Sequence, residues 1–77
     1  MIHYRKPDME TDKLVHMANR IAEFFESFPD REEARLGVAQ HITKFWTPDM
    51  RAQLLAAMQS QQANGLKPLV LEALAAA

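Results

Sequence analysis

Apolar side chains recur every three or four residues along most of the chain, and four prolines divide this pattern into helix-sized segments. The prolines stand at positions 7, 29, 48 and 68, and proline is tolerated in the first turn of a helix but not in its interior. β-Branched residues are sparse, and no alternating run is long enough to predict a strand. The pattern therefore predicts an all-α fold, a small compact bundle of three to four antiparallel helices.

The first predicted helix runs over about residues 12–27, with Thr11 as its N-cap and Asp12 in the first turn. Its apolar residues repeat at helical spacing and form one stripe, which predicts the face that is turned to the core. The members of this stripe are Leu14, Met17, Ala18, Ile21, Phe24, Phe25 and Phe28. Val15 and Ala22 lie beside the stripe and widen it towards half of the helix circumference.

The second predicted helix begins after Asp30, with Glu33 three residues later as a variant of the capping box. Gly37 in the helix interior costs about 1 kcal/mol relative to alanine, and this glycine indicates the close approach of a neighbouring helix. The residues expected to face inward are Ala34, Gly37, Val38, His41, Ile42 and Phe45.

The run Thr47-Pro48-Asp49 has the pattern of an N-cap, a first helical residue and an acid in the first turn. It predicts a third helix that continues to about residue 63 and ends at Asn64-Gly65 as a left-handed cap. Pro68 then opens a short fourth helix. The residues of this helix that are expected to face inward are Leu69, Val70, Ala73 and Leu74.

The beginning of the chain differs from the rest because residues 1–10 carry no helical periodicity. We expect a flexible N-terminal arm over residues 1–10 and a single helical domain over residues 11–77. The arm has basic residues but no apolar segment after them, so it does not have the pattern of a signal peptide. Uninterrupted apolar stretches are only a few residues long, so no membrane span is predicted.

Composition and charge exclude several classes of function. Hydrophobic residues make up 48% and charged residues 25% of the chain, a globular balance, and the net charge of -1 argues against a general nucleic-acid binder. The absence of cysteine excludes disulfides, thiolate zinc sites and iron–sulfur ligation. The three histidines and the carboxylates lack the spacing of a metal site or a catalytic pair, and no glycine-rich loop cradles a phosphate. We expect no catalytic, cofactor-binding or metal site in this chain.

A domain of this size has a small core, so apolar residues outside the core stripes point to a partner. Leu36, Ala39 and Trp46 can form an outward patch along the second helix, and tryptophan is a frequent interface anchor. In the alternative interpretation, Trp46 folds over the corner between the second and third helices and closes the domain's own core. The sequence leaves both interpretations open. The candidate partner-binding residues are Arg35, Leu36, Ala39, Lys44 and Trp46.

Two other functions fit a helical chain of this kind. One is a homo-oligomeric adaptor that uses the same patch on itself, so that the isolated chain forms a homodimer. The other is a helix-turn-helix DNA-binding protein, because the turn between the second and third predicted helices is very short. The third helix has only Arg51 as a cation, which is too little charge for phosphate contacts.

A family resemblance runs through four segments, which are Leu14–Phe25, Pro29–Ala34, Val38–Arg51 and Gly65–Leu74. The third segment includes His41-Ile42-Thr43-Lys44-Phe45-Trp46, a specific motif rather than a compositional similarity. Over roughly residues 12–74 the chain resembles the delta subunit of bacterial NAD-dependent formate dehydrogenase.

This resemblance implies a small accessory subunit of a cytoplasmic molybdenum or tungsten enzyme that oxidises formate to carbon dioxide. It also implies that molybdopterin, iron–sulfur clusters, FMN and NAD bind in the larger subunits, which are then the partners of this chain. No catalytic residue is carried over, because the motif shared with the family is not a catalytic one. The resemblance therefore implies a non-catalytic chain that binds the larger formate dehydrogenase subunits and aids their assembly or stability.

Overall fold

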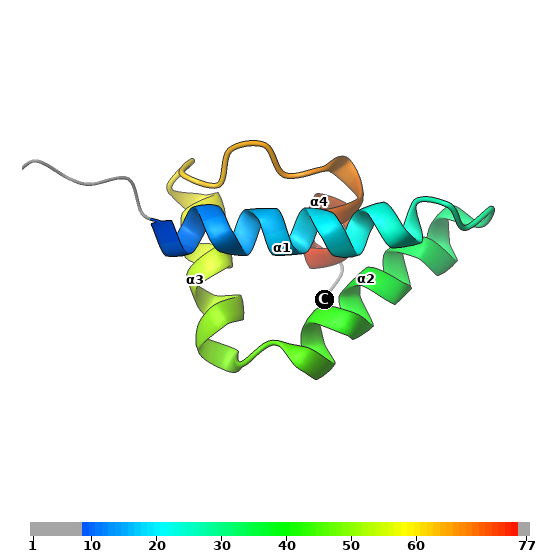
Figure 1. The fold of residues 1–77 in the computed structure, drawn as a ribbon, viewed down its shortest axis with the longest axis horizontal. Coiled ribbons are helices and arrows are strands. Elements are labelled where there is room, and N and C mark those ends of the chain that lie inside the picture. The colour runs from blue at the N-terminus through cyan, green and yellow to red at the C-terminus, as the bar shows by residue number, and fades with distance from the viewer. Residues whose placement is uncertain (1–8, 76–77) are drawn as a thin grey trace, which may run out of the picture.

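In the computed structural model, residues 9–75 are described and form four helices joined by short connections (Figure 1). These are α1 (Met9–Phe25), α2 (Arg31–Phe45), α3 (Pro48–Gln59) and α4 (Pro68–Ala75). The predicted all-α bundle is thereby confirmed. The expected N-terminal arm lies mostly outside the described residues, and its last two residues, Met9 and Glu10, form the start of α1.

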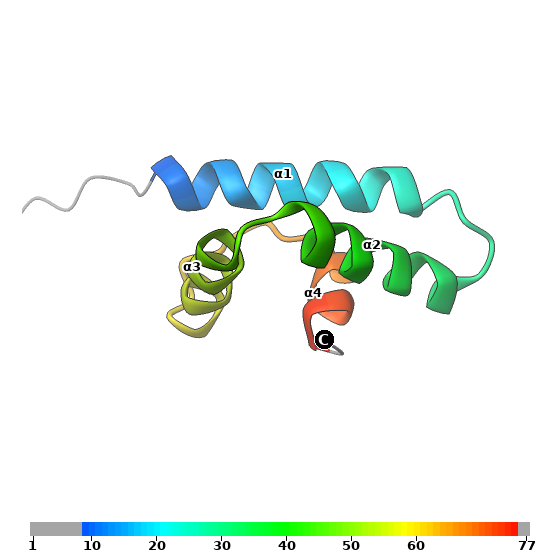
Figure 2. The same cartoon turned by 90° about the horizontal axis from the view of Figure 1, so that it is seen from below.

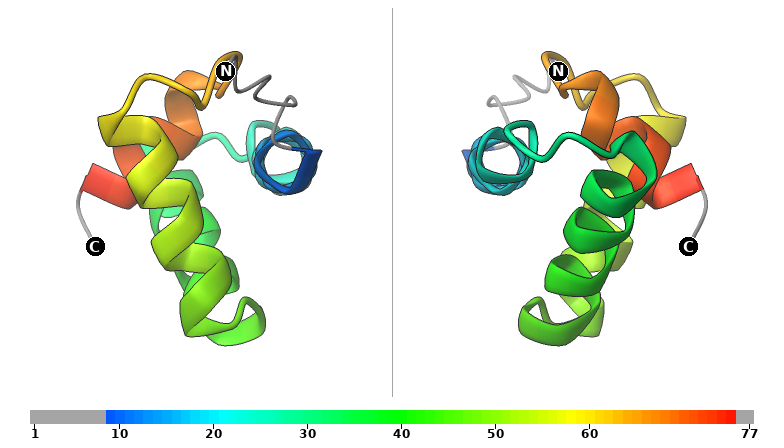
Figure 3. Two further views of the ribbon diagram at one scale, coloured as in Figure 1. Left: turned by 90° about the vertical axis from the view of Figure 1, so that its left-hand side faces the viewer. Right: turned by 90° about the vertical axis from the view of Figure 1, so that its right-hand side faces the viewer.

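The helices form two layers, with α1 along one side of the molecule and the other three helices on the opposite side (Figure 2). α2 turns back from the end of α1 and packs against it, and α3 crosses near the start of α1. α4 packs chiefly against α2. Figure 3, in which α1 is seen end on, shows this helix standing beside the other three. α1 is therefore the element that all the other helices share as a packing partner.

The starts of α2 and α3 follow from the N-caps predicted at Asp30 and Thr47, but within the described residues the Glu33 carboxylate does not bond back to complete the predicted capping box. The Asp30 carboxylate accepts hydrogen bonds from the backbone N–H groups of Glu32 at 2.9 Å and Glu33 at 3.5 Å. The Thr47 hydroxyl accepts the N–H of Met50 at 3.1 Å, and a proline opens α3. Each cap satisfies N–H groups that have no partner within their own helix.

Two predicted helix ends are wrong. α1 begins at Met9 rather than after Thr11, so Thr11 is not an N-cap but a buried residue of the first turn. α3 ends at Gln59, four residues before the predicted end. The reason is a Schellman-type cap with Gln61 in the left-handed conformation at φ 61°.

This cap uses two backbone hydrogen bonds across the end of α3. The N–H of Gln62 donates to the carbonyl of Ala57 at 2.7 Å, and the N–H of Gln61 donates to the carbonyl of Met58 at 3.3 Å. Gly65, the predicted cap, also has a positive φ of 86°, but it lies in the connection to α4. The chain therefore turns twice between α3 and α4, once without the help of a glycine.

The core lies between α1 and the other layer, and apart from Trp46 it is built from small and medium-sized side chains. Its buried apolar members are Leu14, Val15, Ala18, Ala22, Ala34, Val38, Ile42, Trp46, Leu54, Ala57, Leu69, Val70 and Ala73. The predicted inward residues of α4 are confirmed as buried or half-buried. In α1 and α2 the prediction is partly wrong, because Phe24 and Phe45 are 66% and 69% exposed and Met17 is also exposed.

The close contact between α1 and α2 explains why these large side chains lie outside. Ala18 and Ala22 of α1 are fully buried, and they let the neighbouring helices approach closely. The buried stripe is therefore centred on Ala18 and Ala22 rather than on the phenylalanines. Gly37 fits this arrangement, since a Cβ atom added there would lie 2.3 Å from Cε1 of the Phe25 ring. The close approach predicted at Gly37 is therefore made by the Phe25 side chain of α1, because the three nearest atoms all belong to this ring.

No helix within residues 9–75 has both the length and the apolar character that a bilayer crossing requires.

Candidate functional site

The five residues predicted to contact a partner do not form one surface. Trp46 is only 5% exposed and belongs to the core cluster, and Ala39 is half-buried against the same cluster. The structure therefore agrees with the interpretation in which the Trp46 side chain closes the domain's own core. The continuous outward patch of Leu36, Ala39 and Trp46 is therefore not present.

The other three predicted residues lie on different sides of α2. Arg35 forms an ion pair with Glu32 at 3.1 Å. Leu36 points outward, as predicted, and is 46% exposed. Lys44 lies on the side that faces α1, where it lines a hollow together with Phe25. Whether these residues contact a partner stays a prediction.

A shallow groove runs between α1 and α2, and it was not among the sites predicted from the sequence. It consists of three adjoining hollows of about 520, 430 and 410 Å³, and His41 lines all three. We call it the α1–α2 groove. Its lining residues are His16, Met17, Arg20, Ile21, Phe24 and Phe25 from α1, and Gly37, Gln40, His41, Lys44 and Phe45 from α2, with Trp46 and Met50 at the α3 end.

Aromatic and apolar side chains dominate the walls of this groove. The Phe24 and Phe25 rings meet edge to face with centroids 5.0 Å apart, and the His41 ring lies 4.7 Å from the Phe45 ring. Aromatic pairs of this geometry contribute about 0.5–1.5 kcal/mol beyond the burial of their surface. The walls of the α1–α2 groove are therefore mainly apolar and include two such ring pairs.

The charged groups of the groove are all basic. Arg20 and Lys44 lie along it with the imidazoles of His16 and His41, and none of its lining residues is an Asp or Glu. The sequence contains one feature that points to this groove. Arg20 and His41 both belong to the segments that resemble the family, and both lie next to apolar residues at helical spacing. Only the packing of α1 on α2 brings them to one place.

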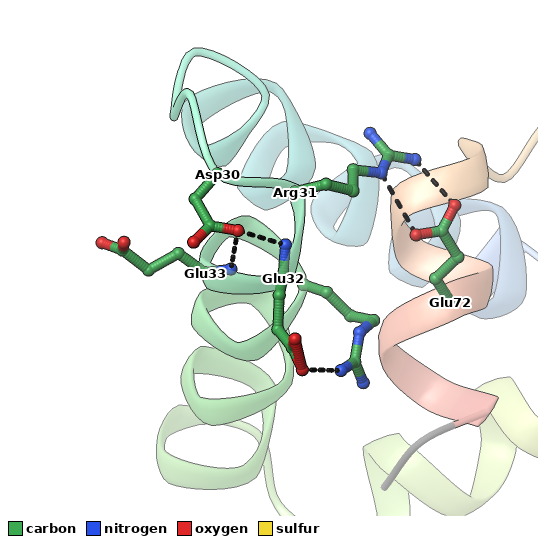
Figure 4. Close-up of polar contacts among 6 residues, drawn as sticks. Asp30, Arg31, Glu32, Glu33 and Glu72 are labelled. Atoms are coloured by element: carbon green, nitrogen blue, oxygen red, sulfur yellow. Dashed lines mark hydrogen bonds and ion pairs between the residues drawn. The ribbon is translucent and has the colours of Figure 1, made fainter.

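The opposite edge of α2 has a different character, because its charges are paired (Figure 4). The Arg31 guanidinium donates two hydrogen bonds to the Glu72 carboxylate, at 3.1 and 2.8 Å, and links α2 to α4. This hydrogen bonding lowers the pKa of Glu72 and raises the pKa of Arg31. Both groups are exposed, so this bridge orients α4 more than it stabilises the fold.

A side-chain clamp holds the connection before α4 against α1. The Asn19 amide donates to the carbonyl of Gly65 at 2.9 Å and accepts the N–H of Lys67, also at 2.9 Å. The Lys67 ammonium group lies 3.5 Å from the Glu26 carboxylate. No local sequence pattern predicts this clamp, since a single Asn within a helix has no recognisable signature.

The described residues also bear on two other functions considered from the sequence, metal binding and DNA binding. No group of three or more His, Cys, Asp or Glu residues within it is arranged to hold a metal ion. Arg51, the cation expected to serve a recognition helix, donates to the carbonyl of Thr43 at 2.9 Å. It is engaged in closing the corner between α2 and α3, which weakens the DNA-binding interpretation further.

The comparisons with known proteins agree with the resemblance found in the sequence. The family model described as NADH-dependent formate dehydrogenase delta subunit FdsD matches residues 13–74, which is most of the 77 residues. Neither a curated protein nor a solved structure matches the chain. Because one family model covers all four helices from the second turn of α1 to near the end of α4, the chain belongs to the family of NADH-dependent formate dehydrogenase delta subunits.

Proposed function

We propose that this chain is a non-catalytic accessory subunit of a cytoplasmic NAD-dependent molybdenum or tungsten formate dehydrogenase. In this role it binds the larger subunits and aids their assembly or stability. The observation that carries the proposal is the family match over residues 13–74. A delta subunit acts within a complex, so the function of the chain lies in its contacts with other subunits.

The chemistry of the chain supports a division of labour within the complex. It has no cysteine, and therefore no thiolate with which to ligate an iron–sulfur cluster. It has two glycines, too few for a glycine-rich loop around the phosphates of FMN or NAD. We therefore assign the molybdopterin, the iron–sulfur clusters, FMN and NAD to the larger subunits.

The predicted contact residues differ in how much side-chain surface they can offer to another subunit. Arg35, Leu36 and Lys44 keep side-chain surface with which to meet another subunit. Ala39 and Trp46 have little surface left, so their contribution to binding is through the shape and stability of α2. Lys44 is the member that also lines the α1–α2 groove.

The test is to express the tagged chain together with the larger formate dehydrogenase subunits of the same source and to purify it under mild conditions. We expect the catalytic subunit to copurify and the purified complex to reduce NAD with formate, while the isolated chain shows no turnover. Recovery of the chain without any dehydrogenase component, from cells that contain intact enzyme, would contradict the proposal.

Self-association is the second candidate, and exposed Phe24, Phe45 and Leu71 favour it. Sedimentation of the purified chain separates the two functions. A monomer that forms a complex only with the larger subunits supports the accessory role, whereas a tight dimer that does not bind them supports the homo-oligomeric adaptor.

A further inference from the structure

The α1–α2 groove combines an exposed aromatic rim with a half-buried floor. Its aromatic rim is exposed at both helices, through Phe24 on α1 and Phe45 on α2. Its floor is formed by Ile21 and His41, which are half-buried. Single exposed apolar residues are ordinary, but several that line one hollow surface are typical of a docking site.

The charge pattern of the groove indicates the chemistry of what it binds. Among the described residues, Arg31, Arg35 and Lys67 form ion pairs with carboxylates, and all three lie outside the groove. The groove cations Arg20 and Lys44 form no ion pair within the described part of the chain. Lys13 and Arg51 form none there either, but they lie outside the groove, so the distinguishing feature of Arg20 and Lys44 is their place beside its apolar side chains. A surface that leaves its cations unpaired beside apolar side chains is complementary to a partner that carries carboxylates beside apolar side chains.

The length of the groove suits a helical occupant. Its lining on α1 extends from His16 to Phe25, which is about 14 Å along the helix axis at 1.5 Å per residue. That length accommodates two to three turns of a helix laid between α1 and α2. Docking of an amphipathic helix into a groove between two helices is a recurrent mode of recognition.

We infer that the α1–α2 groove is the docking site for an acidic amphipathic helix of one of the larger formate dehydrogenase subunits. This inference rests on the proposed function and specifies the surface that carries it. The apolar face of the partner helix packs on Phe24, Phe45 and Ile21, and its carboxylates pair with Arg20 and Lys44. A second copy docked by two-fold symmetry is a poorer occupant, because it brings these cations of both copies together.

The experiment is a competition for incorporation into the complex. Wild-type and variant chains with different tags are coexpressed with the larger subunits, and the ratio of the two chains in the purified complex is measured. The wild-type copy supports assembly, so a weakly binding variant does not abolish the complex. The isolated variants are compared by circular dichroism, which separates loss of binding from loss of fold.

We expect Phe45→Ala to be under-represented at least about tenfold relative to wild type, the effect of removing an interface anchor. Phe24→Ala is the second apolar variant, and both side chains are exposed enough that their loss leaves the fold intact. The matched control is Leu71→Ala on α4, which removes an exposed apolar side chain outside the groove. Its ratio should stay within about twofold of unity.

The charge test compares two double variants that remove the same number of positive charges. Arg20→Gln with Lys44→Gln should be under-represented at least about tenfold and should make retention in the complex less sensitive to added salt. Lys13→Gln with Lys67→Gln changes cations outside the groove, keeps the backbone N–H of residue 67 that bonds to Asn19, and should be incorporated like wild type.

The outcomes separate this inference from the proposed function. If wild-type chain is incorporated and the groove variants are incorporated equally well, the groove is not the docking site, although the accessory role stands. A loss seen with Leu36→Ala and not with Phe45→Ala would move the interface to the outer face of α2. If wild-type chain is not incorporated at all, the proposed function fails and this inference fails with it.

Discussion

The contact between Gly37 of α2 and the Phe25 ring of α1 offers a sharp test of how these two helices pack. A Cβ atom at position 37 would lie 2.3, 2.6 and 2.9 Å from three atoms of that ring. Real Cβ atoms essentially never approach other atoms under 3.0 Å, so Gly37→Ala forces the ring or the helix to move. Overpacking of this kind costs about 1–3 kcal/mol.

The same substitution also has a favourable effect, because alanine is better than glycine in a helix interior by about 1 kcal/mol. The two effects predict that Gly37→Ala destabilises the wild-type chain by about 1 kcal/mol. In a Phe25→Ala background the steric cost disappears and the helix propensity remains. There, Gly37→Ala should stabilise the chain by about 1 kcal/mol, which is a change of sign.

The measurement is a double-mutant cycle by urea unfolding, followed by far-ultraviolet circular dichroism. Because Phe25→Ala removes a half-buried ring, all four proteins are measured in the same stabilising osmolyte. The expected coupling free energy between positions 25 and 37 is about 2 kcal/mol. Equal effects of Gly37→Ala in both backgrounds would refute the close packing of Phe25 on Gly37.

Four further predictions concern the fold. Gln61→Gly should stabilise the chain by about 1 kcal/mol and raise its Tm by a few degrees, since glycine adopts the left-handed cap without strain; an unchanged or lower Tm would contradict the Schellman-type cap. Asn19→Ala should cost about 1–3 kcal/mol and speed hydrogen exchange at the amide of the clamped connection, and no change in exchange would argue against the clamp. Trp46→Ala should lower the unfolding free energy of the isolated chain by about 3–5 kcal/mol in urea, and a loss below about 1 kcal/mol would place this side chain outside the core. The hydrogen bond from Arg31 lowers the pKa of Glu72, so the ionised carboxylate contributes stability above its unfolded pKa, and this contribution is lost as the pH falls from the unfolded pKa through the lowered folded pKa. Glu72→Gln should therefore make the acid-induced loss of Tm shallower, and identical pH profiles would exclude a role for the pair.

The sequence determined those features of the protein that depend on interactions between near neighbours. The N-caps Asp30 and Thr47 and the prolines that open α3 and α4 lie where predicted, because a cap bonds to N–H groups two or three residues away. The family resemblance likewise depends only on the order of residues along the chain, and the family match over residues 13–74 confirms it.

Local interactions do not suffice to predict where a helix ends when two possible caps lie within a few residues of each other. The end of α3 is an example, since the sequence offers Asn64-Gly65 as a cap while the helix ends earlier with Gln61 in the left-handed conformation. A left-handed glutamine costs about 1–2 kcal/mol. In the same structure, the connection that follows this early helix end is bonded to α1, through the contacts of Gly65 and Lys67 with Asn19.

Only the tertiary structure decided which flank of each helix is buried. Hydrophobicity along the sequence predicts that Phe24 and Phe45 are buried, because both are large and apolar. Helix packing, however, depends on how closely the helices approach, which favours Ala18, Ala22 and Gly37 at the contact. The Phe24 and Phe45 rings therefore lie beside the contact instead of inside it, and Trp46 closes the core at the corner between α2 and α3, which is one of the two interpretations that the sequence left open. The α1–α2 groove exists for the same reason: its residues come from two helices, and no spacing along the chain encodes the distance between them.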